Sequence, residues 1–235
     1  FILGVGLGYR EEEFTAFGIK ASERVPRMME FLKVLKLLWG ESEVEFDGDF
    51  YTLPKTKPAT RPVQKPHPPI WIADNNDRAI KRAARLGYPW LINPHATVSV
   101  LARQRGLYRE SFQGSDVVEP SDVPMMRELY IDMDRERAFE LARPYLWPKY
   151  QAYAAWGQDK ALPGEESFAV PFEQLTQDRF LLGTPQDIIR EIERYRDQLG
   201  VNLMLFRMQW PGMPQAQVMH QIALFRDHII PHFRG

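Results

Sequence analysis

The chain has 235 residues, of which 44% are hydrophobic, 12% aromatic and 26% charged, so it can form a substantial core and is not a disordered chain. Its 30 basic and 31 acidic residues give a net charge of −1, which argues against nucleic acid as a partner. It has no cysteine, which excludes disulfides and thiolate sites and fits a cytoplasmic location. Apolar runs stay below the roughly 18 residues that span a bilayer, so no membrane partner is expected.

The first part of the chain predicts a strand, a helix and a hairpin. Residues 1–8 are an apolar run that ends in glycines, as a buried strand would. Apolar side chains recur at three- and four-residue steps between Glu23 and Gly40, which is typical of an amphipathic helix. Asp47-Gly48 separates two short apolar runs and predicts a hairpin, and the proline-rich residues that follow predict an extended segment.

The middle of the chain alternates between strands and helices. Residues 70–73 predict a short buried strand, and the next helix carries an apolar face of Ala79, Ile80, Ala83 and Leu86 before Gly87 ends it. Further along, strands are predicted at residues 88–92 and 123–131, and helices at about residues 98–112 and from residue 135 onwards.

The last third begins with an aromatic-rich stretch at residues 148–180, which predicts an inserted loop with some helix. Thr184-Pro185 is typical of a helix start, and Gly200 of its end. A strand at residues 202–209 and a helix at about residues 214–230 complete the pattern. Strands that alternate with helices in this way predict an α/β fold with a parallel sheet, either an open sheet or a barrel.

Six segments are distinctive when they are taken in order. They read FILGVGLGYREEEFTAFGI, LKLLWG, VEFDGDFYTL, RPVQKPHPPIWIADNN, LLGTPQDIIREI and PGMPQAQVMHQIALFRDHIIPHF. Together they resemble the luciferase-like monooxygenases, the flavin-dependent relatives of bacterial luciferase and of the F420-dependent (deazaflavin) oxidoreductases. The resemblance spans nearly the whole chain.

The resemblance implies a TIM (β/α)8 barrel of the luciferase-like type. The first strand here resembles the family's fourth strand, and residues 202–209 resemble its eighth. We therefore expect residues 1–235 to form a single domain, the C-terminal five strand-helix units of such a barrel, with the inserted loop at about 148–180. About the first three units would be lacking, either because they precede this sequence or because a partner covers the gap.

The end of the first strand is implied to face the flavin. By resemblance, Gly6, Leu7, Gly8 and Tyr9 lie against the isoalloxazine ring and the ribityl chain. Glycines let the backbone approach a flat ring, and Leu7 offers it an apolar surface. The alternative is a tight turn that needs glycine for its backbone angles.

A second cofactor contact is expected where the strand at residues 70–73 ends. Asp74, Asn75 and Asn76 precede a helix whose N-terminal N–H groups suit a phosphate, and the matching family loop holds the flavin phosphate. The family often has glycine or serine there, so Asp-Asn-Asn is a departure, and Asp74 would repel a phosphate unless it points away. The alternative is that all three residues only cap the helix.

Other polar residues are predicted at the same end of the sheet. His95 follows the strand at residues 88–92 and is a candidate catalytic acid or base. Arg127 and Glu128 lie on opposite faces of one strand, and Arg127 is a candidate contact to an anionic group of the cofactor. Arg207 ends the last strand, where it could reach the cofactor.

Aromatic residues are the candidate substrate contacts. Trp210 follows the last strand, and Trp156 and Phe172 lie in the inserted loop, which could act as a lid; packing explains these rings equally well. No metal site is predicted, because His220, His228 and His232 do not have the spacing of zinc ligands and no carboxylate cluster accompanies them.

The resemblance leads to one functional hypothesis and two alternatives. The hypothesis is a flavin-dependent monooxygenase that uses reduced FMN and O2 on a small organic substrate, with a separate flavin reductase as a partner. The first alternative is an F420-dependent oxidoreductase that transfers hydride on the same barrel. The second is a truncated, non-catalytic member that binds flavin. Family members are commonly homodimers, so a cytoplasmic homodimer is expected.

Overall fold

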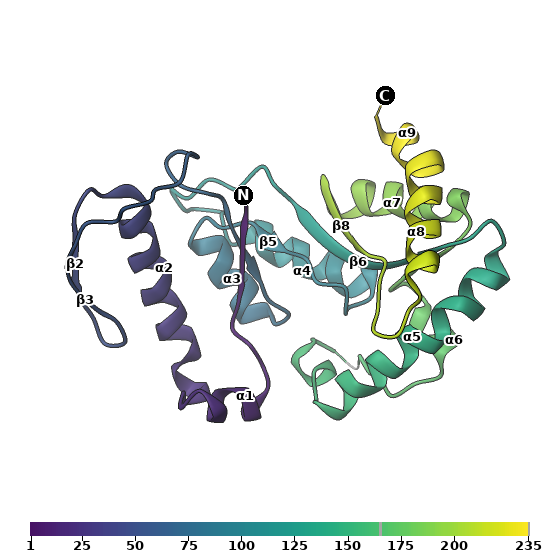
Figure 1. Cartoon of the computed structure of the whole chain (residues 1–235), viewed down its shortest axis with the longest axis horizontal. Helices are drawn as coiled ribbons and strands as arrows, with labels where there is room; N and C mark the ends of the chain where they lie inside the picture. Colours follow the sequence, from purple (N-terminus) through teal and green to yellow (C-terminus); the bar gives the residue numbers. More distant parts are fainter. Residues whose placement is uncertain (165, 235) are drawn as a thin grey trace. The chain divides into compact units, whose positions relative to one another are not determined.

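A computed structural model describes residues 1–164 and 166–234 of the chain. The chain divides into two compact units, Phe1–Trp71 and Ile72–Gly235 (Figure 1). That both units belong to a single domain stays a prediction.

The first unit contains the predicted strand, helix and hairpin, and a short helix that was not predicted. Glu30 of the long helix fixes the hairpin, because its carboxylate accepts the backbone N–H groups of Phe50 at 2.9 Å and Tyr51 at 2.7 Å. The elements are β1 (Leu3–Gly6), α1 (Glu11–Ala16), η1 (Ala21–Glu23), α2 (Arg24–Gly40), β2 (Val44–Asp47) and β3 (Thr52–Thr56), with β2 and β3 antiparallel.

The second unit contains the last two residues of β4 and all later elements. These are β4 (Ile70–Ala73), α3 (Asp77–Arg85), β5 (Trp90–Leu91), α4 (Val98–Glu110), β6 (Pro124–Ile131), α5 (Arg135–Ala155), η2 (Asp159–Ala161), α6 (Phe172–Thr176), β7 (Leu181–Gly183), α7 (Pro185–Leu199), β8 (Leu203–Arg207), α8 (Gln215–Leu224), the π-helical η3 (Phe225–Ile229) and α9 (Ile230–Phe233).

The strands of the second unit pair in parallel, as predicted. Ile72 of β4 pairs with Trp90 of β5, and Ile92 just after β5 forms a parallel bridge with Met125 of β6. On its other side β6 pairs with β8, and its last residues pair with the short strand β7, which was not predicted. Among the described residues these strands form open sheets and no closed barrel. The complete barrel and its missing units therefore stay predictions.

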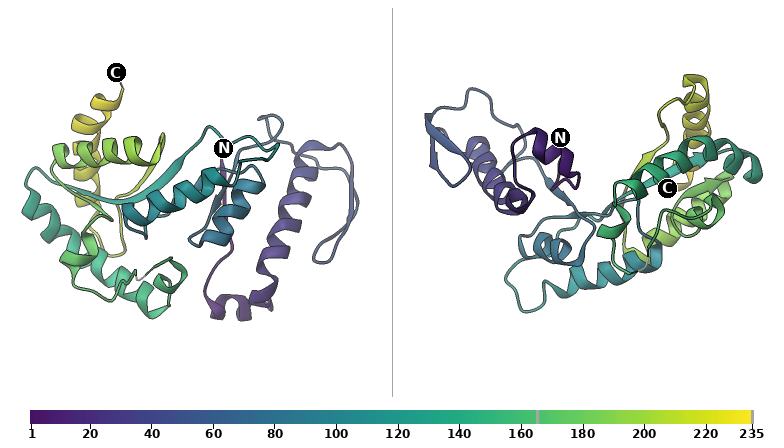
Figure 2. Two further views of the ribbon diagram at one scale, coloured as in Figure 1. Left: turned by 180° about the vertical axis from the view of Figure 1, so that it is seen from behind. Right: turned by 90° about the horizontal axis from the view of Figure 1, so that it is seen from below.

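Helices of the second unit pack against one another and against the strands. α3 packs on α4, α4 on α7, and α7 on η3, while α8 packs on β6 (Figure 2). Strand β6 is almost wholly buried, and so are the inner faces of α4 and α7. The capping box that Thr184 and Asp187 form fixes the start of α7, and Gly200 ends the helix in the left-handed conformation at φ 70°.

One local prediction was wrong, and the bounds of another differ. Leu86 was predicted on the inner face of α3, but it is the C-cap residue and is 44% exposed, because the helix ends one residue earlier. The predicted loop at about 148–180 begins later, because α5 continues through Pro144 and Pro148 to Ala155. A buried stripe at four-residue steps, Ala138, Ala142, Leu146 and Tyr150, holds this helix against the sheet despite the two prolines.

Candidate active site

The two faces of β6 carry different chemistry. Glu128 is in register with Arg207 of β8, so both side chains lie on the same face of the sheet. Arg127 and its neighbour Phe206 lie on the opposite face, where Arg127 contacts the ring of Tyr195 on α7. The sequence prediction that Arg127 and Glu128 face opposite ways is therefore confirmed.

Glu128 is the centre of a polar cluster on the face away from α7. Its side chain is fully buried, and one carboxylate oxygen accepts hydrogen bonds from Lys149 Nζ and, at 3.3 Å, from Arg207. The other oxygen accepts the indole N–H of Trp210 at 2.8 Å. Three donors from α5, from β8 and from the segment after β8 thus converge on one carboxylate.

An open pocket of about 670 Å³ lies directly over this cluster. It is bounded by the C-terminal half of α5 and by the residues that end and follow β8, chiefly Lys149, Tyr153, Trp156, Arg207, Gln209 and Trp210. Trp210 is almost wholly buried and stacks on Tyr130 with 6.4 Å between the ring centroids, whereas Trp156 is 45% exposed at the pocket edge. Aromatic side chains and two cations therefore surround the space.

Lys149 carries a proton that it can exchange near neutral pH. Burial disfavours its charged form and lowers the pKa of the amine to about 8, while the Glu128 carboxylate opposes this shift and Arg207 adds to it. A lysine with such a pKa can act as a general acid or, once deprotonated, as a general base.

His95 lies beside this cluster in the loop after β5. Its ring is packed among Tyr150, Tyr153 and Phe168, with 5.4 Å between the centroids of His95 and Tyr153. Its Nε2 makes a hydrogen bond of 2.9 Å with Gln158. Burial and nearby cations lower the pKa of His95 to about 3, so the ring is neutral at ordinary pH.

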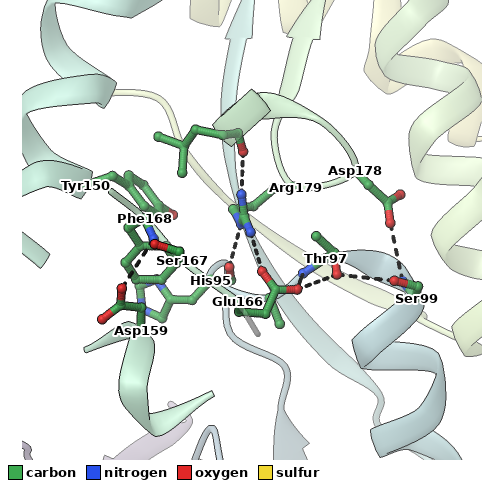
Figure 3. Close-up of polar contacts among 12 residues, drawn as sticks. His95, Thr97, Ser99, Tyr150, Asp159, Glu166, Ser167, Phe168, Asp178 and Arg179 are labelled. Carbon is green, nitrogen blue, oxygen red and sulfur yellow. Dashed lines mark hydrogen bonds and ion pairs between the residues drawn. The ribbon is translucent and has the colours of Figure 1, made fainter. Parts of the chain in front are cut away.

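A second polar cluster fixes the residues that surround His95 (Figure 3). Arg179 donates to the backbone carbonyls of His95 at 2.7 Å and Leu175 at 2.5 Å, and it forms an ion pair with Glu166. The Glu166 carboxylate also accepts the N–H of Thr97 at 3.2 Å and its hydroxyl at 2.5 Å. The segment after α5 is thereby tied to the loop after β5.

In the loop after β4, the polar side chains bond to groups of the same loop and of α3. The Asp74 carboxylate accepts the Asn75 N–H at 3.1 Å and the Asn76 amide at 3.3 Å, and it pairs with Arg82 at 3.4 Å. Asn76 is the N-cap of α3, because its side-chain oxygen accepts the N–H of Ala79 at 3.0 Å. The capping interpretation thus holds for Asn76, and a phosphate role for this loop stays a prediction.

Two other predicted site residues of the second unit, Arg127 and Phe172, do not line the pocket. The guanidinium of Arg127 is fully buried and donates to the Ala96 carbonyl at 3.0 Å. Phe172 is buried at the start of α6 against the guanidinium of Arg143, outside the residues that line the pocket. Residues 6–9 belong to the first unit, where Gly8 has a φ of 72° that favours glycine.

The structure therefore brings together Arg207, Trp210 and Trp156 and places His95 close by. The pattern-based prediction missed Lys149, Gln158, Glu166 and Arg179. Lys149 stands in the stretch WPKYQAYAAW, where a single cation among aromatic residues was the available signal. Because Pro144 and Pro148 signal a helix break, the part of α5 that directs Lys149 towards Glu128 was not predicted.

A sequence profile of the luciferase-like monooxygenase family matches residues 1–202. The chain belongs to the luciferase-like monooxygenase family. Its relatives include the oxygenase component of a flavin-dependent trigonelline monooxygenase from Acinetobacter baylyi, which is 24% identical over 98% of this chain and 67% of that protein. An F420-dependent glucose-6-phosphate dehydrogenase from Amycolatopsis mediterranei is 27% identical over 100% of this chain and 70% of that protein.

Among solved structures, the monooxygenase RslO1 from Streptomyces bottropensis has the same fold over 98% of this chain and 68% of its own, with a TM-score of 0.78 and 23% identity. The fold, the family match and the sequence relatives together make this chain an α/β oxidoreductase. None of its described helices has the length and apolarity that a membrane crossing requires. Within residues 1–164 and 166–234, no group of three or more His, Cys, Asp or Glu side chains is placed to hold a metal ion.

Proposed function

We propose that this chain is a flavin-dependent monooxygenase that acts on a small organic substrate with reduced FMN and O2. The observation that carries the proposal is the pocket over Glu128, where Lys149 can exchange a proton beside aromatic side chains. The flavin-dependent relative from Acinetobacter baylyi supports the choice of cofactor. Because that relative is an oxygenase component, a separate flavin reductase is the partner that we propose.

The residues of the pocket have distinct roles in this proposal. Trp156 and Trp210 hold the organic body of the substrate and exclude water from it. Glu128 orients Lys149 and Arg207, and Lys149 donates or accepts a proton at Nζ. His95 is buried and neutral, and we propose that it acts as a hydrogen-bond partner of Gln158 rather than as an acid at neutral pH.

The loop after β4 does not fit an FMN phosphate in the arrangement that the structure describes. The Asp74 carboxylate already takes up the donors of Asn75, Asn76 and Arg82 that a phosphate would use. Phosphate binding at Asn75 and Asn76 therefore requires that Asp74 turn away. That Gly6 to Tyr9 contact the flavin ring remains part of the proposal, as does an anion contact for Arg127. When it is bound, the cofactor supplies the electrons for the reaction.

An F420-dependent hydride transfer is the second candidate function. The relative from Amycolatopsis mediterranei favours it, because the similarity at 27% identity covers the whole of this chain. The same pocket would then hold the substrate, and oxygen would not be required.

We also propose that both units belong to one TIM barrel domain in a cytoplasmic homodimer. The parallel order of β4, β5, β6 and β8, each connected through helices, supports the barrel. Light scattering coupled to size-exclusion chromatography measures the oligomeric state directly, and a monomeric mass would contradict the homodimer.

The function is tested by anaerobic titration with FMN, reduced FMN and reduced F420, followed by exposure to O2. Under the main proposal reduced FMN binds more tightly than reduced F420, and the bound reduced FMN reacts with O2 at a rate different from that of free reduced FMN. Tighter binding of F420 would select the hydride-transfer alternative. Binding of neither cofactor would contradict both.

A further inference from the structure

The pocket over Glu128 carries more positive than negative charge. Lys149 and Arg207 share a single carboxylate, so the cluster has one cation in excess. The side chain of Glu128 is fully buried behind the two cations, whereas those of Lys149 and Arg207 are 13% and 37% exposed. A ligand in the pocket therefore meets the cations and not the carboxylate.

The remaining lining adds no compensating charge. Besides the two cations, the described residues that line the pocket are aromatic, small or uncharged, and none is acidic. Tyr153, Trp156 and Trp210 supply flat apolar surfaces next to the cations. A cation left in excess in a pocket with apolar walls favours an anion, because hydrogen bonds between charged groups are stronger than those between neutral ones.

We infer that the pocket over Glu128 binds an organic anion, with a carboxylate or similar group held by Lys149 and Arg207 and an aromatic or other flat apolar body against Trp156 and Trp210. This inference rests on the proposed function, because it takes the anion to be the substrate of the oxidoreductase. It assigns Arg207 to the substrate, whereas the sequence predicted a contact to the cofactor.

The test compares a negatively charged probe with a neutral one of similar size. Benzoate and benzamide have the same ring and similar shape, and calorimetric titration of the whole protein at pH 7 measures the affinity for each. We expect benzoate to bind at least about tenfold more tightly, which is the range for one or two charge-assisted hydrogen bonds. Equal affinities, a preference for benzamide, or no binding of either probe would overturn the inference.

Variants locate the effect in the pocket. Lys149→Gln and Arg207→Gln should each weaken benzoate binding about tenfold and change benzamide binding less than about twofold. Arg143→Gln is the matched control, because Arg143 lies on the same helix but pairs with Glu173 outside the pocket, and it should leave both affinities unchanged. Lys149→Arg keeps the charge and should keep most of the preference, which covers the case in which Lys149→Gln fails to fold. Benzoate affinities that do not respond to Lys149→Gln and Arg207→Gln in folded protein would overturn the inference.

The anionic group in question could also be that of the cofactor, so a further titration separates the two sources. Benzoate should bind with the same affinity when the protein is saturated with FMN. Competition between benzoate and FMN would overturn the assignment to substrate. The outcome is independent of the flavin test, since a protein that binds reduced FMN but does not distinguish the two probes keeps its proposed function and loses this inference. A protein that distinguishes them but binds no flavin or F420 keeps an anion pocket and loses the proposed function.

Discussion

The polar clusters around Glu128 and Glu166 contain the same kinds of residue but differ in net charge. In each, a buried carboxylate of the second unit pairs with a cation from another part of the chain. Glu166 faces one arginine, Arg179, whose other donors are taken up by backbone carbonyls. Glu128 faces two cations, and these extend to the wall of an open pocket.

The difference shows which buried ion pair serves structure and which is suited to binding. A cluster with equal charges and satisfied donors gains nothing from a ligand, and its function is to hold two segments together. A cluster with a cation in excess beside a pocket is incomplete without a counterion from outside. His95 contacts both clusters. Its carbonyl accepts a hydrogen bond from Arg179, and its ring packs against Tyr153, whose ring also contacts the Lys149 amine.

The largest effect on stability should come from removing Arg179 from the Glu166 cluster. Arg179→Ala leaves Glu166 buried without its cation and removes donors from two carbonyls, so we expect the free energy of unfolding to fall by about 3–5 kcal/mol. Urea denaturation measures this loss. Arg190→Ala, which removes a 65% exposed partner of Asp187, is the control and should cost no more than about 0.5 kcal/mol. Equal losses for the two variants would show that the Glu166 cluster does not hold the fold.

Acid should destabilise the fold through His95. Its pKa is about 3 in the folded protein and near 6.5 when unfolded, so between these values the unfolded chain binds the extra proton. This stability is fully present well above pH 6.5 and falls as the pH is lowered, by about 2–2.5 kcal/mol between pH 6.5 and 4.5. Urea denaturation across this range should give that slope, and His95→Gln should flatten it. A slope that survives in the variant would assign the effect to other groups.

Raising the pH should stabilise the fold through Lys149 of the Glu128 cluster, by somewhat less than acid destabilises it. The pKa of Lys149 is about 8 in the folded protein and near 10.4 when unfolded, so above pH 8 the folded amine is neutral while the unfolded one is still charged. Stability should therefore rise with pH, by about 2 kcal/mol between pH 8 and 9.5. Lys149→Met should remove this rise. A stability that is level from pH 8 to 9.5 in the unchanged protein would contradict a lowered pKa of Lys149.

Local patterns were enough to predict most elements of this fold. The hairpin around Asp47-Gly48, the caps of α3 and α7 and the parallel pairing follow from turn residues, capping residues and alternation, all of which act over a few positions. The short strand β7 was missed because three residues before a capping box give no periodicity. The end of α5 was missed because proline signals a break, whereas tertiary packing of Leu146 and Tyr150 decides the outcome.

The site was predictable only where position along a strand was sufficient. Arg207 ends β8 and Trp210 follows it, so their place at the end of the strand followed from the sequence. Lys149 reaches Glu128 from 21 positions away and Arg179 reaches the carbonyl of His95 from 84 positions away, and such contacts have no signature in a single sequence. The family resemblance adds contacts for the cofactor, and Asp74 is the residue where resemblance and local structure point in different directions.

The smallest expected effect tests that disagreement at Asp74. If the loop after β4 binds the phosphate of FMN, its carboxylate competes with the ligand, and Asp74→Asn should tighten FMN binding about three- to tenfold, roughly 1 kcal/mol. Riboflavin has the same ring without the phosphate, so its affinity should change less than about twofold. Asp77→Asn is the matched control, because Asp77 begins the same helix but is held by two hydrogen bonds from Arg103 at 2.8 and 2.9 Å. An equal gain for FMN and riboflavin, or none for either, would place the phosphate away from this loop. Asp74, Asn75 and Asn76 would then serve only to begin α3, and the cofactor-binding role predicted from the family would not apply to them.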